Sequence, residues 1–245
     1  TGQVQSRHAV DSFEWYERVY MKAFDQFYPD CHEAAFFCLL PSYLERTGSS
    51  LVVMADGLIK RSKNPLSGFY LNNYDELKVN LQKASELNQK VVLLGVTFGL
   101  LDFLDSSAGI DIAPAIVMET GGMKGRRKEM VRAEVHELLR KGFNIPKIHS
   151  EYGMTELTSQ AYSKGDGVFF CPPWMKVLIR ESSDPFSLQK KAKAGGINVI
   201  DLANVESCAF IETSDLGKMQ LNGGFEVLGR FDHAEVRGCN LLVLD

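Results

Sequence analysis

Six residues in the middle of the chain, Glu-Tyr-Gly-Met-Thr-Glu at positions 151–156, combine side chains that could bind a nucleotide. Tyr152 offers a flat face on which a base could stack, and Gly153 permits a tight backbone path beside it. Thr155 offers a hydroxyl to a phosphate oxygen, and Glu156 offers the hard oxygen ligand that Mg²⁺ prefers. The same six residues could also form an ordinary surface loop, so the hypothesis needs support from other parts of the chain.

Two charged residues further along the chain could hold the ribose of such a nucleotide. Asp215 follows an apolar run in the stretch 212–217, and a carboxylate can accept hydrogen bonds from both ribose hydroxyls. Arg230, in Gly-Arg-Phe-Asp at 229–232, could donate a fork of hydrogen bonds to ribose or phosphate. The simpler alternatives are an Asx turn for Asp215 and a solvated surface charge for Arg230.

A pair of glycines, Gly121 and Gly122, follows an apolar run and precedes a helical pattern. Glycines in such a turn let the backbone approach a base or a phosphate closely. Lys124, Arg126 and Arg127 then place positive charge at the start of the helix, where the helix dipole disfavours it. These cations could therefore face an anion, although solvated surface positions explain them equally well.

The elements around these clusters predict an α/β fold with a mostly parallel sheet flanked by helices. Short apolar runs alternate with helical patterns, as in βαβ units, and ligands of such sheets bind beyond the carboxyl ends of the strands. We expect helices over residues 11–27, 72–89 and 124–141, and strands over 34–40, 90–96, 114–119 and 144–150. On the third helix we expect a buried face of Val131, Val135, Leu138 and Leu139, and Gly142 as the residue that ends it.

The character of the sequence changes after residue 151. Short strand patterns with Gly, Asp and Asn turns then follow one another. The sequence thus predicts an α/β body over 1–151 and a smaller β-rich subdomain over 152–245 that completes the site. The chain opens Thr-Gly-Gln-Val-Gln-Ser without Met, so we expect the front of the first unit to be missing.

The composition narrows the class of protein. The chain has 245 residues, 45% of them hydrophobic, and a net charge of -4, which gives no basic footprint for nucleic acid. No run of eighteen apolar residues and no signal peptide is present, so we expect no membrane span. The five cysteines form no CxxC pair, which favours a reducing, cytoplasmic location. Four of them, Cys31, Cys38, Cys171 and Cys208, are expected in the core.

Taken in order, the clusters resemble the motifs of the adenylate-forming superfamily, which includes acyl-CoA synthetases, luciferases and peptide-synthetase adenylation domains. The motifs of that family are a Ser/Thr/Gly-rich phosphate loop, a Gly-Gly adenine loop, YGxTE, TGD and a GRxD hinge. Here the last four read Gly121-Gly122, YGMTE, TSD and GRFD, and the opening TGQVQS looks like the tail of the phosphate loop. The resemblance implies an adenylate-forming domain that lacks the front of its phosphate loop, and ATP and Mg²⁺ as cofactors.

The resemblance also implies a role for each site residue. Tyr152 would stack on adenine, Thr155 would contact the α-phosphate and Glu156 would hold Mg²⁺. Asp215 and Arg230 would hold the ribose.

Three further assignments concern the acyl group and the phosphate charge. The stretch 95–98, Gly-Val-Thr-Phe, would shape the acyl pocket. Lys124 is the candidate cation over the developing phosphate charge, and His149 could contact the acyl carboxylate or a phosphate.

Within this superfamily the chain is most similar to the acyl-protein synthetases of bacterial bioluminescence and their acyltransferase relatives, over nearly its whole length. That branch passes its acyl group to a cysteine near the C-terminus, which matches Cys239 here. The usual C-terminal domain with its catalytic lysine has no counterpart, which puts a second half-reaction with coenzyme A in doubt. A small buried thiol is the alternative for Cys239.

The implied activity is conversion of a carboxylic acid, for which we expect a fatty acid, to acyl-AMP, followed by transfer to a thiol. The transfer would end on an acyl-accepting protein or a reductase partner. Two alternatives stay open: an acyl-CoA ligase without its C-terminal domain, and a non-catalytic fragment that binds nucleotide or acyl groups.

Overall fold

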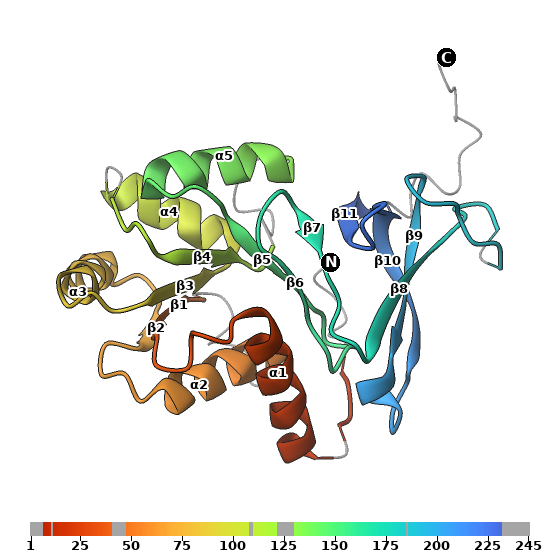
Figure 1. Ribbon diagram of the computed structural model, residues 1–245, viewed down its shortest axis with the longest axis horizontal. Coiled ribbons are helices and arrows are strands. Elements are labelled where there is room, and N and C mark those ends of the chain that lie inside the picture. Colours follow the sequence, from red (N-terminus) through yellow and green to blue (C-terminus); the bar gives the residue numbers. More distant parts are fainter. Residues whose placement is uncertain are drawn as a thin grey trace.

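The computed structural model describes residues 7–10, 12–40, 48–107, 110–121, 130–184 and 186–231, which build two β-sheets (Figure 1). Sheet A has six strands in the order β2-β1-β3-β4-β5-β6. Strands β1 to β5 are parallel, and β6 pairs antiparallel with β5. The strands are β1 Ala35–Leu39, β2 Gly68–Tyr70, β3 Val91–Gly95, β4 Ile116–Glu119, β5 His149–Tyr152 and β6 Ala161–Ser163.

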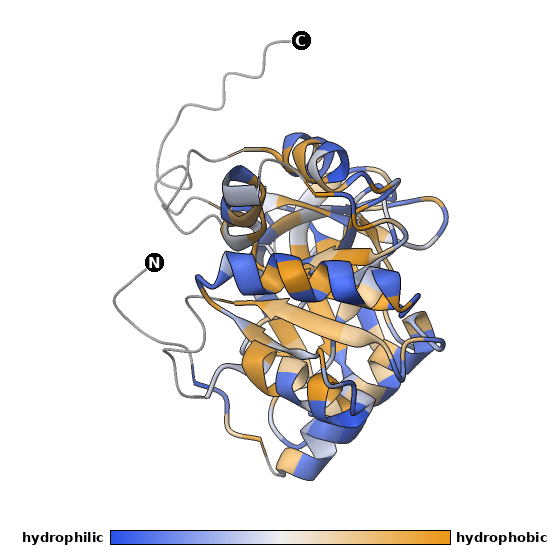
Figure 2. Cartoon of the chain, turned by 90° about the vertical axis from the view of Figure 1, so that its left-hand side faces the viewer, coloured by the Kyte–Doolittle hydropathy of each residue, from blue (hydrophilic) through white to orange (hydrophobic). Residues whose placement is uncertain are grey.

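Helices cover both faces of sheet A (Figures 1 and 2). Helices α1 and α2 pack on one face, and α3, α4 and α5 pack on the other. In Figure 2 the strands between them are largely orange, which marks hydrophobic residues. The helices are α1 Phe13–Phe27, α2 Ser50–Ser62, α3 Tyr74–Glu86, α4 Thr97–Ser107 and α5 Arg132–Phe143. None of the described helices is both long and apolar enough to cross a membrane.

The first strand illustrates why this sheet is buried on both sides. Successive side chains of a strand point to opposite faces. Phe37 and Leu39 accordingly join the cluster under α3 to α5, whereas Phe36 and Cys38 join the cluster under α1 and α2. All five residues of β1 are buried, which is the reason for its uninterrupted apolar sequence.

Sheet B is antiparallel and has the strand order β7-β11-β10-β9-β8. Its strands are β7 Val168–Phe169, β8 Met175–Arg180, β9 Ala194–Asp201, β10 Phe210–Met219 and β11 Phe225–Arg230, with a short 3₁₀ turn, η1 Leu202–Asn204, after β9. The expected α/β fold with a parallel sheet and a β-rich second part is thus confirmed. The change of sheet comes after β6, since the hairpin of β5 and β6 belongs to sheet A.

The end of α5 differs from the expectation, and packing explains the difference. Gly142 lies inside the helix, and Asn144 ends it in the left-handed conformation, with φ of 53°. A Cβ on Gly142 would lie 2.5 Å from Cδ1 of Leu104 in α4, so glycine lets this side chain pack closely against α5. The predicted buried face is half right: Val131 and Leu138 are exposed.

Candidate functional site

The stretch 151–156 begins inside a strand and leaves it at the carboxyl edge of sheet A. Glu151 and Tyr152 are the last residues of β5, and Gly153 begins the turn that follows. Within this turn Thr155 is exposed and Glu156 is partly buried. The neighbouring parallel strand β4 ends at the same edge with Glu119, which pairs in register with Ser150.

Three of the predicted site residues meet at this edge, although they are far apart in the sequence. The Tyr152 hydroxyl donates a hydrogen bond of 2.8 Å to Oδ2 of Asp215. The other carboxylate oxygen of Asp215 lies 3.3 Å from Nε of Arg230. Asp215 and Arg230 are cross-strand partners in β10 and β11, so sheet B presents them as a pair. The side chain of Arg230 is 71% exposed, which leaves most of its donors available to a ligand.

The ring of Tyr152 is packed more tightly than its expected stacking role suggests. It is 8% exposed and meets Phe169 and Phe225 edge-on, at centroid distances of 5.9 and 5.5 Å. Burial, followed by the charge of Asp215, raises the pKa of the Tyr152 phenol, so the hydroxyl stays protonated and donates. A base could meet only the small exposed part of the ring, and the stacking role stays a prediction.

A bulge in β10 presents Asp215 to the site. The pairing of β10 with β9 shifts register between Glu212 and Leu216. Arg180, on β8, fastens this bulge: its Nη2 donates 2.9 Å to the carbonyl oxygen of Thr213, and the Thr213 hydroxyl bonds the backbone N–H of Asp215. Bulges of this kind re-aim a side chain. Sequence reasoning missed Arg180, because an Arg in a strand gives no sign of being only 6% exposed.

A buried carboxylate, Asp201, fixes the chain that follows the Thr155–Glu156 turn. Its two oxygens accept hydrogen bonds from the backbone N–H groups of Thr158, Ser159 and Ala203 and from the Ser159 hydroxyl, at 2.7 to 3.1 Å. Asp201 is fully buried. It lies at the end of β9, so it ties sheet B to the loop of sheet A that carries the candidate phosphate contacts.

Asn204 completes this attachment from the 3₁₀ turn. Its side-chain amide donates 2.9 Å to the carbonyl oxygen of Glu156, and its amide oxygen accepts from the hydroxyl of Thr158. His8 lies 2.9 Å from the same amide oxygen. The signal in the sequence was a polar pair, Asp201 and Asn204, directly after the apolar run of β9, and our sequence reasoning did not use it.

Glu119 organises the other side of the edge. Its Oε2 accepts hydrogen bonds from the hydroxyl of Thr97, at 3.1 Å, and from the backbone N–H of Gly121, at 2.7 Å. Its Oε1 accepts from the hydroxyl of Ser150 at 2.9 Å. Gly121 has φ of 76°, the left-handed region that glycine tolerates best. One carboxylate therefore joins β4, β5 and the start of α4, and holds Gly121, the first residue of the predicted adenine loop.

Helix α5 supplies the countercharge for Glu119. His136 Nε2 lies 3.3 Å and Arg132 Nε lies 3.6 Å from Oε1. Burial alone would raise the pKa of this carboxyl, which is 3% exposed. The hydrogen bond from His136, the charge of Arg132 and the N–H of Gly121 outweigh it and lower the pKa to about 2. Glu119 is therefore a buried anion at neutral pH, and His136 is its partner.

The side chains of His149 and Phe98 contact other parts of the protein. His149 Nδ1 lies 3.0 Å from the Tyr28 hydroxyl. Burial, with the nearby charges of Lys164 and Lys147, lowers the pKa of His149 to about 4. Phe98 is fully buried in the cluster under α1 and α2.

Three of the predicted residues, Gly122, Lys124 and Cys239, lie outside the described residues. Among the other cysteines, Cys208 was wrongly expected in the core: it is exposed in the connection to β10. No group of three or more His, Cys, Asp or Glu side chains in the described ranges is placed to hold a metal ion. A single carboxylate such as Glu156 could still hold Mg²⁺, since this ion usually takes one or two carboxylates together with phosphates and water.

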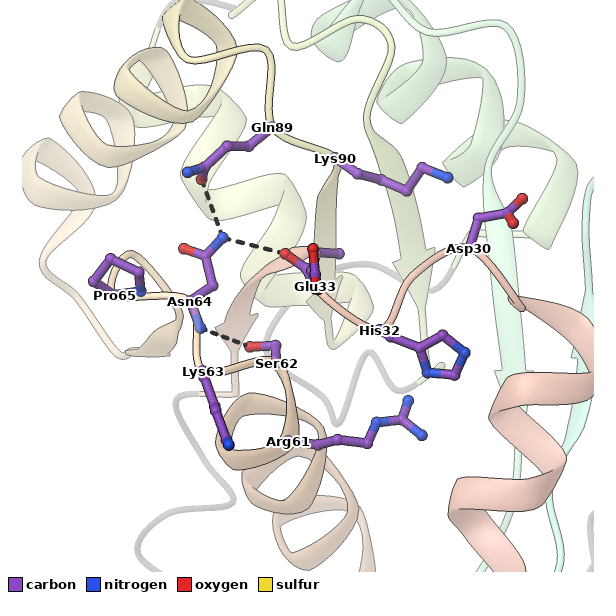
Figure 3. A pocket seen from close by; sticks show the side chains of 11 residues that line it. Asp30, His32, Glu33, Arg61, Ser62, Lys63, Asn64, Pro65, Gln89 and Lys90 are labelled. Carbon is purple, nitrogen blue, oxygen red and sulfur yellow. Dashed lines mark hydrogen bonds between the residues drawn. The ribbon is translucent and has the colours of Figure 1, made fainter.

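A polar pocket of about 770 Å³ lies at the opposite edge of the sheet, where β1 and β3 begin (Figure 3). Asn64 spans it, with hydrogen bonds to the carbonyl oxygen of Glu33 and to the side chain of Gln89. Its lining mixes cations, among them Lys63 and Lys90, with acidic residues. It is at the amino ends of the strands, away from the cluster of Tyr152, Asp215 and Arg230.

Comparison with solved structures identifies proteins of similar fold. ATP-bound MatB from Rhodopseudomonas palustris matches with a TM-score of 0.63 and 16% identity, over 85% of this chain and 42% of that chain. A luciferase-like enzyme from the mealworm Zophobas morio matches with 0.58 and 13%, over 90% of this chain and 54% of that chain. A 2-hydroxyisobutyryl-CoA ligase in the postadenylation state, with R3-HIB-AMP, matches with 0.64 and 10%, over 89% and 48%.

These neighbours are adenylate-forming enzymes, and the likeness establishes the fold. The chain spans about half the length of each of the three structures. No protein-family model matches the sequence, and no curated protein matches it significantly.

Proposed function

We propose that this protein activates a carboxylic acid with ATP to form an acyl adenylate. The observation that carries the proposal is the meeting of Tyr152, Asp215 and Arg230 at the carboxyl edge of a parallel sheet. Ligands of such sheets bind at this edge. The ATP-bound and adenylate-bound states of two enzymes with the same fold support the assignment.

The nucleotide would lie across the seam of the two sheets. Asp215 can accept from both ribose hydroxyls, and the exposed Arg230 can donate to the ribose or a phosphate. The base would lie against Tyr152 and the loop at Gly121 and Gly122. Glu119 holds the backbone N–H of Gly121 at the start of this loop.

In the reaction, a carboxylate oxygen of the acid attacks the α-phosphorus of ATP, and the bond to the pyrophosphate oxygen breaks. The chain contributes positioning and charge stabilisation. The exposed hydroxyl of Thr155 would contact the α-phosphate, and Glu156 would help to hold Mg²⁺, which neutralises phosphate charge when bound. Lys124 is the proposed cation over the developing charge.

The second step of the proposal passes the acyl group to a thiol. The sequence resemblance to acyl-protein synthetases of bioluminescence assigns this role to Cys239 and predicts an acyl-accepting protein or reductase as partner, in the cytoplasm. The ligases among the structural neighbours favour a second candidate, an acyl-CoA ligase. Discharge of the adenylate that depends on coenzyme A would identify the second candidate, and acyl transfer to Cys239 would identify the first. A non-catalytic nucleotide- or acyl-binding module is the third candidate.

The test is ATP–pyrophosphate exchange across a panel of carboxylic acids that begins with fatty acids, together with a thermal-shift titration of a non-hydrolysable acyl-AMP analogue. We expect Asp215→Ala to lower the affinity for the analogue by about 100-fold, because two hydrogen bonds to a charged group are lost. Glu206→Ala, in the exposed turn between η1 and β10, is the matched control and should bind normally. Binding without exchange would leave only the non-catalytic reading, and unchanged affinity of Asp215→Ala would mean that the ribose lies elsewhere.

A further inference from the structure

Glu151 has a carboxyl group to which the proposed activation reaction assigns no role. It precedes Tyr152 in β5, so its side chain points to the opposite face of sheet A, and it pairs across the strands with Tyr162. The side chain is partly buried. Among the described residues its carboxyl group has no hydrogen-bond donor and no ion-pair partner.

The groups around Glu151 are phenols and another acid. Beyond the effect of burial, the charge of Glu151 raises the pKa of Tyr16 in α1 and of Tyr162 in β6. Glu119 of β4 repels the ionised form of Glu151. Burial, followed by the charge of Glu119, raises the pKa of Glu151 to about 8. Within the described part of the chain no Lys, Arg or His side chain offsets this.

One oxygen of this carboxyl group lies against Gly153, which begins the turn after β5. A Cβ added to Gly153 would overlap Oε1 of Glu151, so this oxygen lies against the start of the turn that carries Thr155. Gly153 itself is exposed, so the oxygen adjoins an accessible stretch of backbone. Thr155, the proposed contact of the α-phosphate, is two residues further along this turn, so we expect the first atoms of an acid bound there to approach this oxygen.

A half-buried carboxyl group with no donor among the described residues is costly to ionise, and a bound donor lowers that cost. We propose that the acid activated at this site carries a hydrogen-bond donor, an amino or hydroxyl group close to its carboxylate, and that Glu151 binds this donor. The inference rests on the proposed function and narrows its substrate from carboxylic acids in general to acids substituted in this way. It makes Glu151 a specificity-determining residue.

The test uses ATP–pyrophosphate exchange with three acids of equal chain length: unsubstituted, 2-hydroxy and 2-amino. We expect the kcat/KM of the wild-type protein for one substituted acid to exceed that for the unsubstituted acid by about 100-fold or more, since sites built around a donor reject analogues without it. Glu151→Leu should remove the preference and Glu151→Gln should reduce it, whereas Glu137→Gln, on the outer face of α5, should preserve it. The thermal transition of each variant checks that it is folded.

The pH dependence separates the two donors. An ammonium group needs ionised Glu151, so a preference for the 2-amino acid should grow as the pH rises towards 8. A preference for the 2-hydroxy acid that lacks this increase identifies a hydroxyl group. Equal kcat/KM for all three acids, or an unchanged preference in Glu151→Leu, would overturn the inference and leave the proposed function standing. Absence of exchange with every acid would overturn both.

Discussion

Replacement of Glu119 by Gln tests whether one buried anion holds the carboxyl edge of sheet A together. The substitution keeps the shape of the side chain but removes its charge. The hydroxyls of Thr97 and Ser150 and the N–H of Gly121 would then compete for a single carbonyl oxygen, and Arg132 would face a neutral amide. We expect a folded protein of lower stability.

The magnitude follows from the pKa of Glu119, which folding lowers from 4.5 to about 2. At 1.36 kcal/mol per unit, this shift corresponds to about 3 kcal/mol of stabilisation at pH 7. A carboxyl whose pKa is lowered by folding stabilises the folded state above its unfolded pKa, and this contribution disappears as the pH falls. The difference between wild type and Glu119→Gln should therefore be about 3 kcal/mol at pH 7 and roughly half of that at pH 3.

Urea unfolding of both proteins at several pH values measures this difference. Glu137→Gln is the control, because Glu137 lies on the same side of the fold in α5 but pairs with Arg140 and Lys141 on the surface. It should unfold at the same urea concentration as the wild type. A Glu119→Gln variant as stable as the wild type at pH 7, or a loss of stability that does not change with pH, would refute the reasoning.

Three further substitutions test the other anchors. Asp201→Ala leaves the donors of the loop after Glu156 unsatisfied and should cost about 3–5 kcal/mol in the free energy of unfolding, measured by urea denaturation. Glu151→Gln should instead stabilise the protein at high pH. Folding raises the pKa of this carboxyl to about 8, so ionised Glu151 destabilises the folded state as the pH rises. The free energy of unfolding of the variant should exceed that of the wild type by roughly 2–4 kcal/mol at pH 9 and equal it at pH 4. Arg180→Met releases the bulge that presents Asp215, and should weaken the acyl-AMP analogue about tenfold in a thermal-shift titration, with Glu206→Ala as the unaffected comparison.

The sequence predicted the elements whose signal is local. The apolar run 34–40 and the helical pattern 11–27 became β1 and α1, and α1 begins after Ser12, whose hydroxyl accepts the N–H of Trp15 as an N-cap should. Gly142 was misread because a glycine near the end of a helical pattern has the same sequence signature whether it ends the helix or admits a neighbour. Only the position of Leu104 in the folded protein separates the two.

The candidate site divides in the same way. Tyr152, Asp215 and Arg230 were found from local motifs, and the fold brings them together. Glu119 and Asp201 escaped notice, because an acidic residue after an apolar strand reads as the start of a surface turn. Their burial depends on donors that are distant in the sequence, such as Thr97 and Ser150 for Glu119 and Thr158 for Asp201, and no local pattern reports that.

The two sheets depend on each other at the candidate site. Sheet A supplies the turn with Thr155 and Glu156, but the anchors of that turn, Asp201 and Asn204, come from sheet B. Sheet B supplies Asp215, but the hydroxyl that orients it belongs to Tyr152 of sheet A. A displacement of one sheet against the other would therefore disturb the proposed phosphate contacts and the proposed ribose contacts together. Substitutions on either side of the seam should then affect nucleotide binding non-additively, as residues of one hydrogen-bonded network do.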